Sequence, residues 1–206
     1  MRLAYIFSLI LLCTLGCDNS TPKPNVTPAN TETNTTQPNP FANATTFKQK
    51  KIEAKIASWK DVQKFVKLQK GKIVVIDIWS TWCDPCMREY PHLVALQKKY
   101  PKQVVCLSFN VNYDGIEDSP PESNKQDIME FLVKQDSQLT NIISNIASDD
   151  FYDATDLGSI PVVYVYNPDG TVNKIFKDSK EYGQEGFSYK KHIIPLVDKL
   201  VLELKE

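Results

Sequence analysis

Two cysteines separated by two residues, Cys83 and Cys86, are the side chains of this sequence best suited to chemistry. Such a pair can bind a metal, close a small structural loop or form a reversible disulfide. A strand-like run ends just before the pair and a helical pattern begins at it. Backbone N–H groups and the helix dipole would therefore stabilise a thiolate on Cys83. Cys86, about one turn inside the helix, would then be the resolving thiol that attacks a mixed disulfide and releases the substrate.

The other uses of the pair fit the sequence less well. A zinc site needs about four ligands, and the remaining candidates, Cys106, His92 and His192, include no second pair of this kind. Covalent haem attachment needs a histidine directly after the second cysteine, where Met87 stands. A static disulfide around so small a loop would remove little entropy from the unfolded chain. We interpret the pair as redox-active without metal or cofactor. A non-catalytic metal- or protein-binding module is the alternative.

Two acidic residues near the pair could adjust its chemistry. Asp77 lies in an apolar strand-like run, where burial would raise its pKa and let it exchange a proton with the thiol of Cys86. The alternative for Asp77 is a carboxylate at a strand end that accepts a backbone N–H. Asp84 and Pro85 lie between the cysteines and are the candidates for tuning the redox potential. The charge of Asp84 next to Cys83 opposes thiolate formation, which favours a reductant over a strong oxidant.

The elements that must position these residues describe one α/β domain. Strand and helix patterns alternate around the cysteines, and this order implies parallel strands. In chain order the sequence predicts a helix after Ser58 that ends by Gly71, a buried strand over 73–79, a helix from the cysteines to Tyr100, a strand over 104–109, a loop over 112–123, a helix that includes 128–133, a hairpin of strands over 162–166 and 172–176, and a last helix over 188–204 interrupted at Pro195.

Several spacings around the pair together resemble the thioredoxin superfamily, and specifically its membrane-tethered bacterial TlpA and ResA type, over about residues 50–206. The matching residues besides the cysteines are Asp77, Trp79, Trp82, Pro91 and the dipeptide Ile160-Pro161.

The resemblance implies a thioredoxin fold, with a central mixed β-sheet flanked by helices. It makes Asp77 the buried acid of the site and Pro161 a cis-proline that faces the cysteines. The exposed backbone of Ile160 would then pair with an extended substrate segment. Trp79 and Trp82 are expected to pack around the site, with Trp82 on the substrate side.

The stretch from residue 112 to 159 is longer than a minimal thioredoxin needs, and the TlpA type carries an insertion here. We expect a strand over 139–146 and a short helix over 149–157 within it. This added surface would bias the choice of partner more than the chemistry. A peroxide-reducing redoxin is a further alternative, but its Pro-x-x-x-Thr-x-x-Cys signature is absent because Thr81 lies only two residues before Cys83.

The N-terminal residues predict export. Arg2 precedes an apolar run over 3–15, which is shorter than the roughly 20 residues of a membrane-spanning helix. Residues 14–17 resemble a lipobox, which implies a signal peptide over 1–17 and a lipid on Cys17; an ordinary cleaved signal or an uncleaved anchor is the alternative. Residues 18–46 are rich in Thr, Asn and Pro and predict a disordered linker to a domain over 47–206.

Charge and resemblance together limit the partners. With 24 basic and 25 acidic side chains the formal net charge is -1, which disfavours binding to nucleic acid. The resemblance implies a monomer anchored on the periplasmic side of a bacterial membrane. It would reduce disulfides of envelope proteins, such as those of cytochrome c maturation, and a membrane thiol-reductant transporter would supply its electrons.

Overall fold

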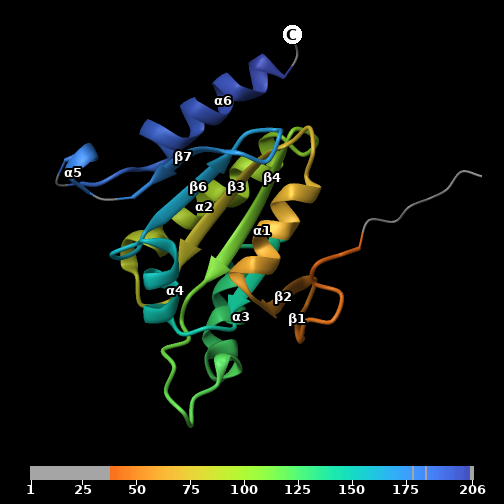
Figure 1. Ribbon diagram of the computed structural model, residues 1–206, viewed down its shortest axis with the longest axis vertical. Coiled ribbons are helices and arrows are strands. Elements are labelled where there is room, and N and C mark those ends of the chain that lie inside the picture. The colour runs from red at the N-terminus through yellow and green to blue at the C-terminus, as the bar shows by residue number, and fades with distance from the viewer. Residues whose placement is uncertain (1–37, 178, 184, 205–206) are drawn as a thin grey trace, which may run out of the picture. The chain divides into compact units, whose positions relative to one another are not determined.

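The strand that ends just before the cysteine loop, β3 (Ile73–Trp79), lies inside a seven-stranded mixed sheet. Every residue of β3 is buried, as expected for a β-branched run that is covered on both faces of a sheet. The sheet order is β1-β2-β5-β4-β3-β6-β7 (Figure 1). This computed structural model describes residues 38–177, 179–183 and 185–204.

Parallel strands form the middle of the sheet and antiparallel strands form its edges. The parallel set is β2 (Ile52–Ala57), β5 (Thr140–Ser144), β4 (Val104–Asn110) and β3, and the antiparallel set is β1 (Thr46–Gln49), β6 (Val162–Tyr166) and β7 (Val172–Phe176). In this register Asp77 of β3 lies between Ser108 of β4 and Val163 of β6. The expected mixed sheet and the predicted parallel pairing are confirmed.

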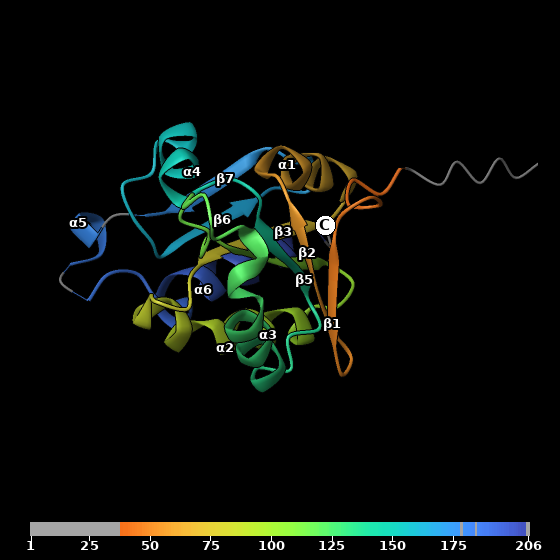
Figure 2. The ribbon, with the colours of Figure 1, turned by 90° about the horizontal axis from the view of Figure 1, so that it is seen from below.

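Helices cover both faces of the sheet and divide the core into two apolar layers. Figure 2 shows α1 and α4 on one face and α2, α3 and α6 on the other. The helical elements are α1 (Trp59–Leu68), α2 (Asp84–Lys99), η1 (Pro121–Asn124), α3 (Lys125–Lys134), α4 (Ser148–Thr155), α5 (Ser179–Tyr182), the π-helical η2 (Tyr189–Ile193) and α6 (Ile194–Glu203).

Local sequence signals explain where the helices begin. Ser58 caps α1, since its hydroxyl oxygen accepts the N–H of Asp61 at 3.1 Å. The last helical segment changes its hydrogen-bond pattern close to Pro195: a π-helical turn precedes α6, and Pro195 occupies the first turn of α6.

The start of the domain differs from the sequence prediction in two ways. The hairpin of β1 and β2 was not predicted: β1 has only four residues and none of them is buried, and the alternation of apolar and charged side chains in β2 covers only five residues. Residues 38–46, expected to belong to the linker, include Phe41, which is buried and packs against Phe65 with ring centroids 5.4 Å apart. Packing against the domain therefore begins before the expected boundary at residue 47.

The expected signal peptide, the Cys17 lipidation site and most of the linker lie outside the described residues. Within residues 38–204, apart from the gaps at 178 and 184, no helix is long and apolar enough to cross a membrane.

The expected insertion is present and builds on the sheet. Its strand β5 lies between β2 and β4, and its helix α4 follows close to the predicted place. The loop after β4 holds the start of α4, because the amide N–H of Ser148 donates to the carbonyl oxygen of Tyr113 at 2.7 Å. Gly115 in this loop has a φ of +83°, and a Cβ built on it would lie 2.8 Å from the Cβ of Ala147. The insertion therefore depends on a glycine at this contact.

We expect Gly115→Ala to destabilise the fold more than Gly71→Ala. Both glycines have a positive φ, so both variants bear the same backbone penalty, but nothing lies within 4 Å of a Cβ at Gly71. The extra loss for Gly115→Ala should be about 1–3 kcal/mol, the usual range for overpacking. Urea unfolding of both variants measures this difference, and equal losses would contradict the described contact.

Candidate active site

Cys83 and Cys86 form a disulfide at the start of α2, with Cα atoms 5.2 Å apart. Cys83 is the N-cap residue of the helix, and the amide N–H of Cys86 donates to its sulfur at 3.3 Å. Cys83 retains 9% of its surface exposed and Cys86 retains 2%. Cys83 is thus the more accessible residue of the pair, although it is largely covered.

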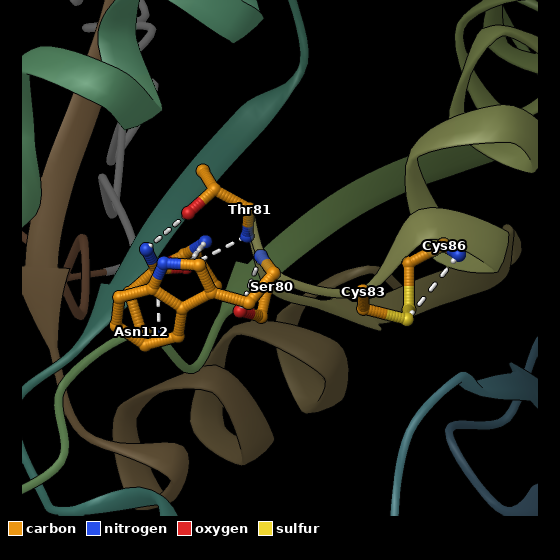
Figure 3. Close-up of a disulfide and its surroundings, with 7 residues drawn as sticks. Ser80, Thr81, Cys83, Cys86 and Asn112 are labelled. Carbon is orange, nitrogen blue, oxygen red and sulfur yellow. Dashed lines mark hydrogen bonds between the residues drawn. A yellow bond between two sulfur atoms is a disulfide. The ribbon is translucent and has the colours of Figure 1, made fainter.

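A hydrogen-bonded clamp holds the loop between β3 and the disulfide (Figure 3). The N–H of Thr81 donates to the side-chain oxygen of Asn112 at 2.9 Å, and the Asn112 amide donates back to the Thr81 hydroxyl at 2.6 Å. The hydroxyl oxygen of Ser80 accepts the N–H of Trp82 at 3.1 Å. Because Asn112 is buried just beyond the end of β4, the clamp fixes Cys83 relative to the sheet.

A groove of about 470 Å³ lies on the Cys83 side of the disulfide. Trp82 and Ile160 line it, as does Tyr152 from the insertion helix α4. Trp82 is 64% exposed, so it offers an uncovered aromatic face at the rim. The peptide bond between Ile160 and Pro161 is cis. The structure thus brings both predicted substrate-side residues, Trp82 and Ile160, to the groove beside Cys83.

A second, larger cleft of about 610 Å³ lies on the Cys86 side. Asp77, Pro161 and Cys86 line it together, and so do Glu89 of α2 and Tyr189 of η2. The predicted acid, the proline and the resolving cysteine therefore share one cleft. A solvent molecule in this cleft could carry a proton between the Asp77 carboxyl group and the sulfur of Cys86 once the disulfide is reduced.

Asp77 is buried with 2% of its surface exposed. Burial raises its pKa from 3.8 to about 7; the hydrogen bond from Tyr189 opposes this shift and the negative charge of Glu89 adds to it. The Tyr189 hydroxyl donates to Asp77 Oδ2 at 2.7 Å. The alternative prediction, a carboxylate satisfied by a backbone N–H, is not what the structure shows. A carboxyl group with a pKa near 7 can both accept and donate a proton at neutral pH.

Other candidate residues lie away from the sulfurs or have structural partners. Trp79 is fully buried between Tyr90 and Phe131, so its expected packing role holds. Cys106 is a buried free thiol, and burial raises its pKa well above the ordinary value. His92 lines the Cys86 cleft, whereas the ring nitrogen of His192 accepts the N–H of Ser188 at 3.0 Å.

A metal site is not evident in the part of the chain that the structure describes. No three His, Cys, Asp or Glu side chains among those residues gather closely enough to hold a metal ion. The residues between the cysteines, Asp84 and Pro85, form the first turn of α2 and line the groove beside Cys83.

The structure adds four residues that the sequence interpretation missed. Glu89 was the easiest of them to predict from the sequence, since an acidic residue three positions after Cys86 lies on the same side of a helix. Asn112 follows a buried strand at its carboxyl end, where sites gather in α/β sheets. Tyr152 lies in the insertion, and Tyr189 is separated from Asp77 by 112 residues. No local pattern connects those last two residues to the site.

The profile of the AhpC/TSA family matches residues 42–175. Thiol-disulfide oxidoreductase ResA of Bacillus subtilis (strain 168) is 29% identical over 107 residues, which are 52% of this chain and 53% of that protein. Thioredoxin H-type of Fagopyrum esculentum is 31% identical over 91 residues, which are 42% of this chain and 76% of that protein.

A thioredoxin family thiol:disulfide interchange protein from Chlorobium tepidum TLS has a similar crystal structure, with a TM-score of 0.48 and 18% identity. The match covers 65% of this chain and 82% of that one. The chain spans just over half the length of the Bacillus subtilis relative.

The raised pKa of Asp77 predicts a pH-dependent gain of stability in Asp77→Asn. Between pH 3.8 and about 7 the Asp77 carboxyl group loses its proton in the unfolded chain and keeps it in the folded chain. The wild-type protein therefore loses stability as the pH rises, and asparagine removes that loss. The variant should be nearly neutral near pH 3.8 and more stable above pH 7 by up to about 4 kcal/mol. Urea unfolding at the two pH values measures this, and an equal gain at both would contradict the shifted pKa.

Proposed function

This chain belongs to the AhpC/TSA family of thioredoxin-like proteins, and on that premise we propose that it is a thiol–disulfide oxidoreductase acting through Cys83 and Cys86. The observation that carries the proposal is the place of the Cys83 sulfur. It lies at the N-cap of α2, accepts the N–H of Cys86 and borders the groove beneath Trp82. Such a position stabilises a thiolate and gives a substrate disulfide a place to approach.

The proposed reaction transfers two electrons to a substrate disulfide in two exchanges. In the reduced protein the Cys83 thiolate attacks one substrate sulfur, forms a mixed disulfide and expels the other substrate sulfur as a thiolate, which takes up a proton. Cys86 then gives its proton to the Asp77 carboxylate and attacks the Cys83 sulfur. The Cys83–Cys86 bond forms, the bond to the substrate breaks, and the released thiolate takes up a proton. The protein ends oxidised and the substrate ends as a dithiol.

We propose an extended polypeptide as the substrate. Trp82, whose side chain is exposed, and Ile160 line the groove beside Cys83; a substrate main chain would pair with the Ile160 backbone, and a substrate side chain would pack on the indole. Tyr152 of the insertion helix forms part of the same wall. The insertion would therefore contribute to the choice of substrate.

We propose that the protein works as a reductant. Asp84 occupies the first turn of α2 directly after Cys83, where its negative charge counteracts the stabilisation that the helix start gives to a thiolate. A less stable Cys83 thiolate makes the reduced form less stable, and that form then gives electrons away more readily, as in thioredoxin rather than in strongly oxidising relatives of the fold.

The cellular setting is also a proposal. The apolar N-terminal run and the sequence around Cys17 support export and a lipid anchor on the outer side of a bacterial membrane, and residues 18–46 would act as a tether. In that compartment the partners would be disulfide-bearing envelope proteins, such as those of cytochrome c maturation. A membrane thiol-reductant transporter would restore the dithiol.

A peroxide-reducing role fits the site less well. Such a role would need a hydroxyl group that faces the reactive sulfur, and Thr81 is the nearest threonine in sequence. Its hydroxyl instead accepts the Asn112 amide in the loop clamp. Rapid oxidation of the reduced protein by hydrogen peroxide, without reduction of protein disulfides, would favour that alternative.

A Cys86→Ser variant tests the proposal. Without the resolving thiol, the reduced variant should form a stable mixed disulfide with insulin through Cys83, which a reductant reverses, while the wild-type protein should catalyse insulin reduction. Cys106→Ser is the matched control, because the buried Cys106 lines neither cleft, and it should retain wild-type turnover.

The same Cys86→Ser variant, expressed in the native host, should identify physiological substrates by mass spectrometry. An absence of insulin adducts on Cys83, together with a redox titration that shows no two-electron transition, would contradict the proposed function.

A further inference from the structure

Tyr189 connects two of the acidic residues that line the Cys86 cleft, Asp77 and Glu89. Its hydroxyl group donates to Asp77 Oδ2 at 2.7 Å, and its backbone N–H donates to Glu89 Oε2 at 2.8 Å. Asp77 lies on β3, Glu89 lies on α2, and Tyr189 begins η2, so three elements meet at one residue. Tyr189 is 1% exposed, and burial and the negative charge of Asp77 raise its pKa well above the ordinary value. The hydroxyl is therefore a hydrogen-bond donor at any pH in which the protein works.

The segment that carries Tyr189 is held in an irregular conformation. Residues 189–193 form a π-helical turn rather than an α-helical one, and such turns are uncommon and often occur at functional sites. The hydroxyl oxygen of Ser188 accepts the N–H of Lys191 at 3.3 Å, and the N–H of Ser188 donates to the ring of His192 at 3.0 Å. Together with Glu89, these contacts fix where the Tyr189 side chain enters the core.

Several titratable groups surround Asp77, but they act on it differently. Within the described residues, Tyr189 supplies the hydrogen bond to the carboxyl group, and Glu89 acts through its charge. The titratable and charged groups that line this cleft or act on Asp77 are Cys86, Arg88, Glu89, Tyr90 and His92 of α2, Cys106 of β4, Glu185, and Tyr189, Lys190 and Lys191 of η2. The hydroxyl of Tyr90 instead contacts Ser137 and Asn141. Tyr189 is therefore the residue placed to orient Asp77.

We propose that Tyr189 is the positioning residue for Asp77: its hydroxyl orients the carboxylate toward the Cys86 cleft and stabilises the charged form that takes the proton of Cys86. The inference rests on the proposed function, because it assigns a role in the second exchange. Without the hydroxyl, the buried carboxyl group would hold its proton more tightly and accept the Cys86 proton only at higher pH. Tyr189 acts through Asp77 and does not touch the sulfurs.

Tyr189→Phe tests this inference in the oxidised full-length protein, where Cys83 and Cys86 are joined in the disulfide and do not titrate with Asp77. The carboxyl carbon signal of Asp77 in ¹³C NMR should titrate near pH 7 in the wild-type protein. It should titrate about one to two pH units higher in the variant, since a hydrogen bond to a charged group has this magnitude. Tyr90→Phe is the matched control, because it removes another buried hydroxyl without changing a hydrogen bond of Asp77.

A kinetic measurement adds a result that a purely structural role would not give. In the reduced protein, the pH profile of insulin reduction should move to higher pH in Tyr189→Phe and stay in place in Tyr90→Phe. If Tyr189→Phe fails to fold, replacement of Tyr189 by 3-fluorotyrosine tests the inference instead. Its more acidic hydroxyl should donate a stronger hydrogen bond and lower the titration midpoint of Asp77.

Two failures can be distinguished. An unchanged Asp77 midpoint in both Tyr189 variants, in a protein that reduces insulin, would overturn the inference and leave the proposed function intact. A wild-type protein that never reduces insulin or forms mixed disulfides would overturn the proposed function. The NMR titration would still be measurable in that case, because it uses the oxidised state and needs no turnover.

Discussion

The site depends on one hydrogen bond at the start of α2, in which the amide N–H of Cys86 donates to the sulfur of Cys83. A sulfur at this position gains from the unpaired N–H groups and the dipole of the helix only if the loop before it is held in place. The clamp between Thr81 and Asn112 holds that loop, and it depends in turn on the parallel pairing of β3 with β4. The pairing of β3 with β4 in the central sheet therefore helps to hold the sulfur of Cys83 in place.

The two sides of the disulfide offer different surroundings. The groove beside Cys83 is lined by the exposed Trp82 and by Ile160, which suit contact with another polypeptide. The cleft beside Cys86 has a buried acid whose pKa is raised to about 7, mainly by burial. In the proposed reaction the first exchange occurs on the polypeptide side and the proton leaves on the acid side.

Features encoded within short stretches could be predicted from the sequence, and contacts between distant stretches could not. The apolar run of β3, the helix pattern after Cys83 and the turn residues before β7 each determine their own element. The hairpin of β1 and β2 is weakly encoded, because β1 has four residues of which none is buried and β2 has only six. The partner of Asp77 was missed for a different reason: Tyr189 reaches it through the packing of a π-helical turn against α2, and no local signal encodes that packing.

The rate at which iodoacetamide alkylates each cysteine of the reduced protein, measured across pH by mass spectrometry, tests the central claim most directly. The account predicts that Cys83 reacts much faster than Cys86 and Cys106. It also predicts that the pKa governing the Cys83 rate lies below the usual range of a free cysteine thiol, because the helix start stabilises the thiolate. A Cys83 that reacts no faster than the buried Cys106, or only at the pH of an ordinary thiol, would contradict it.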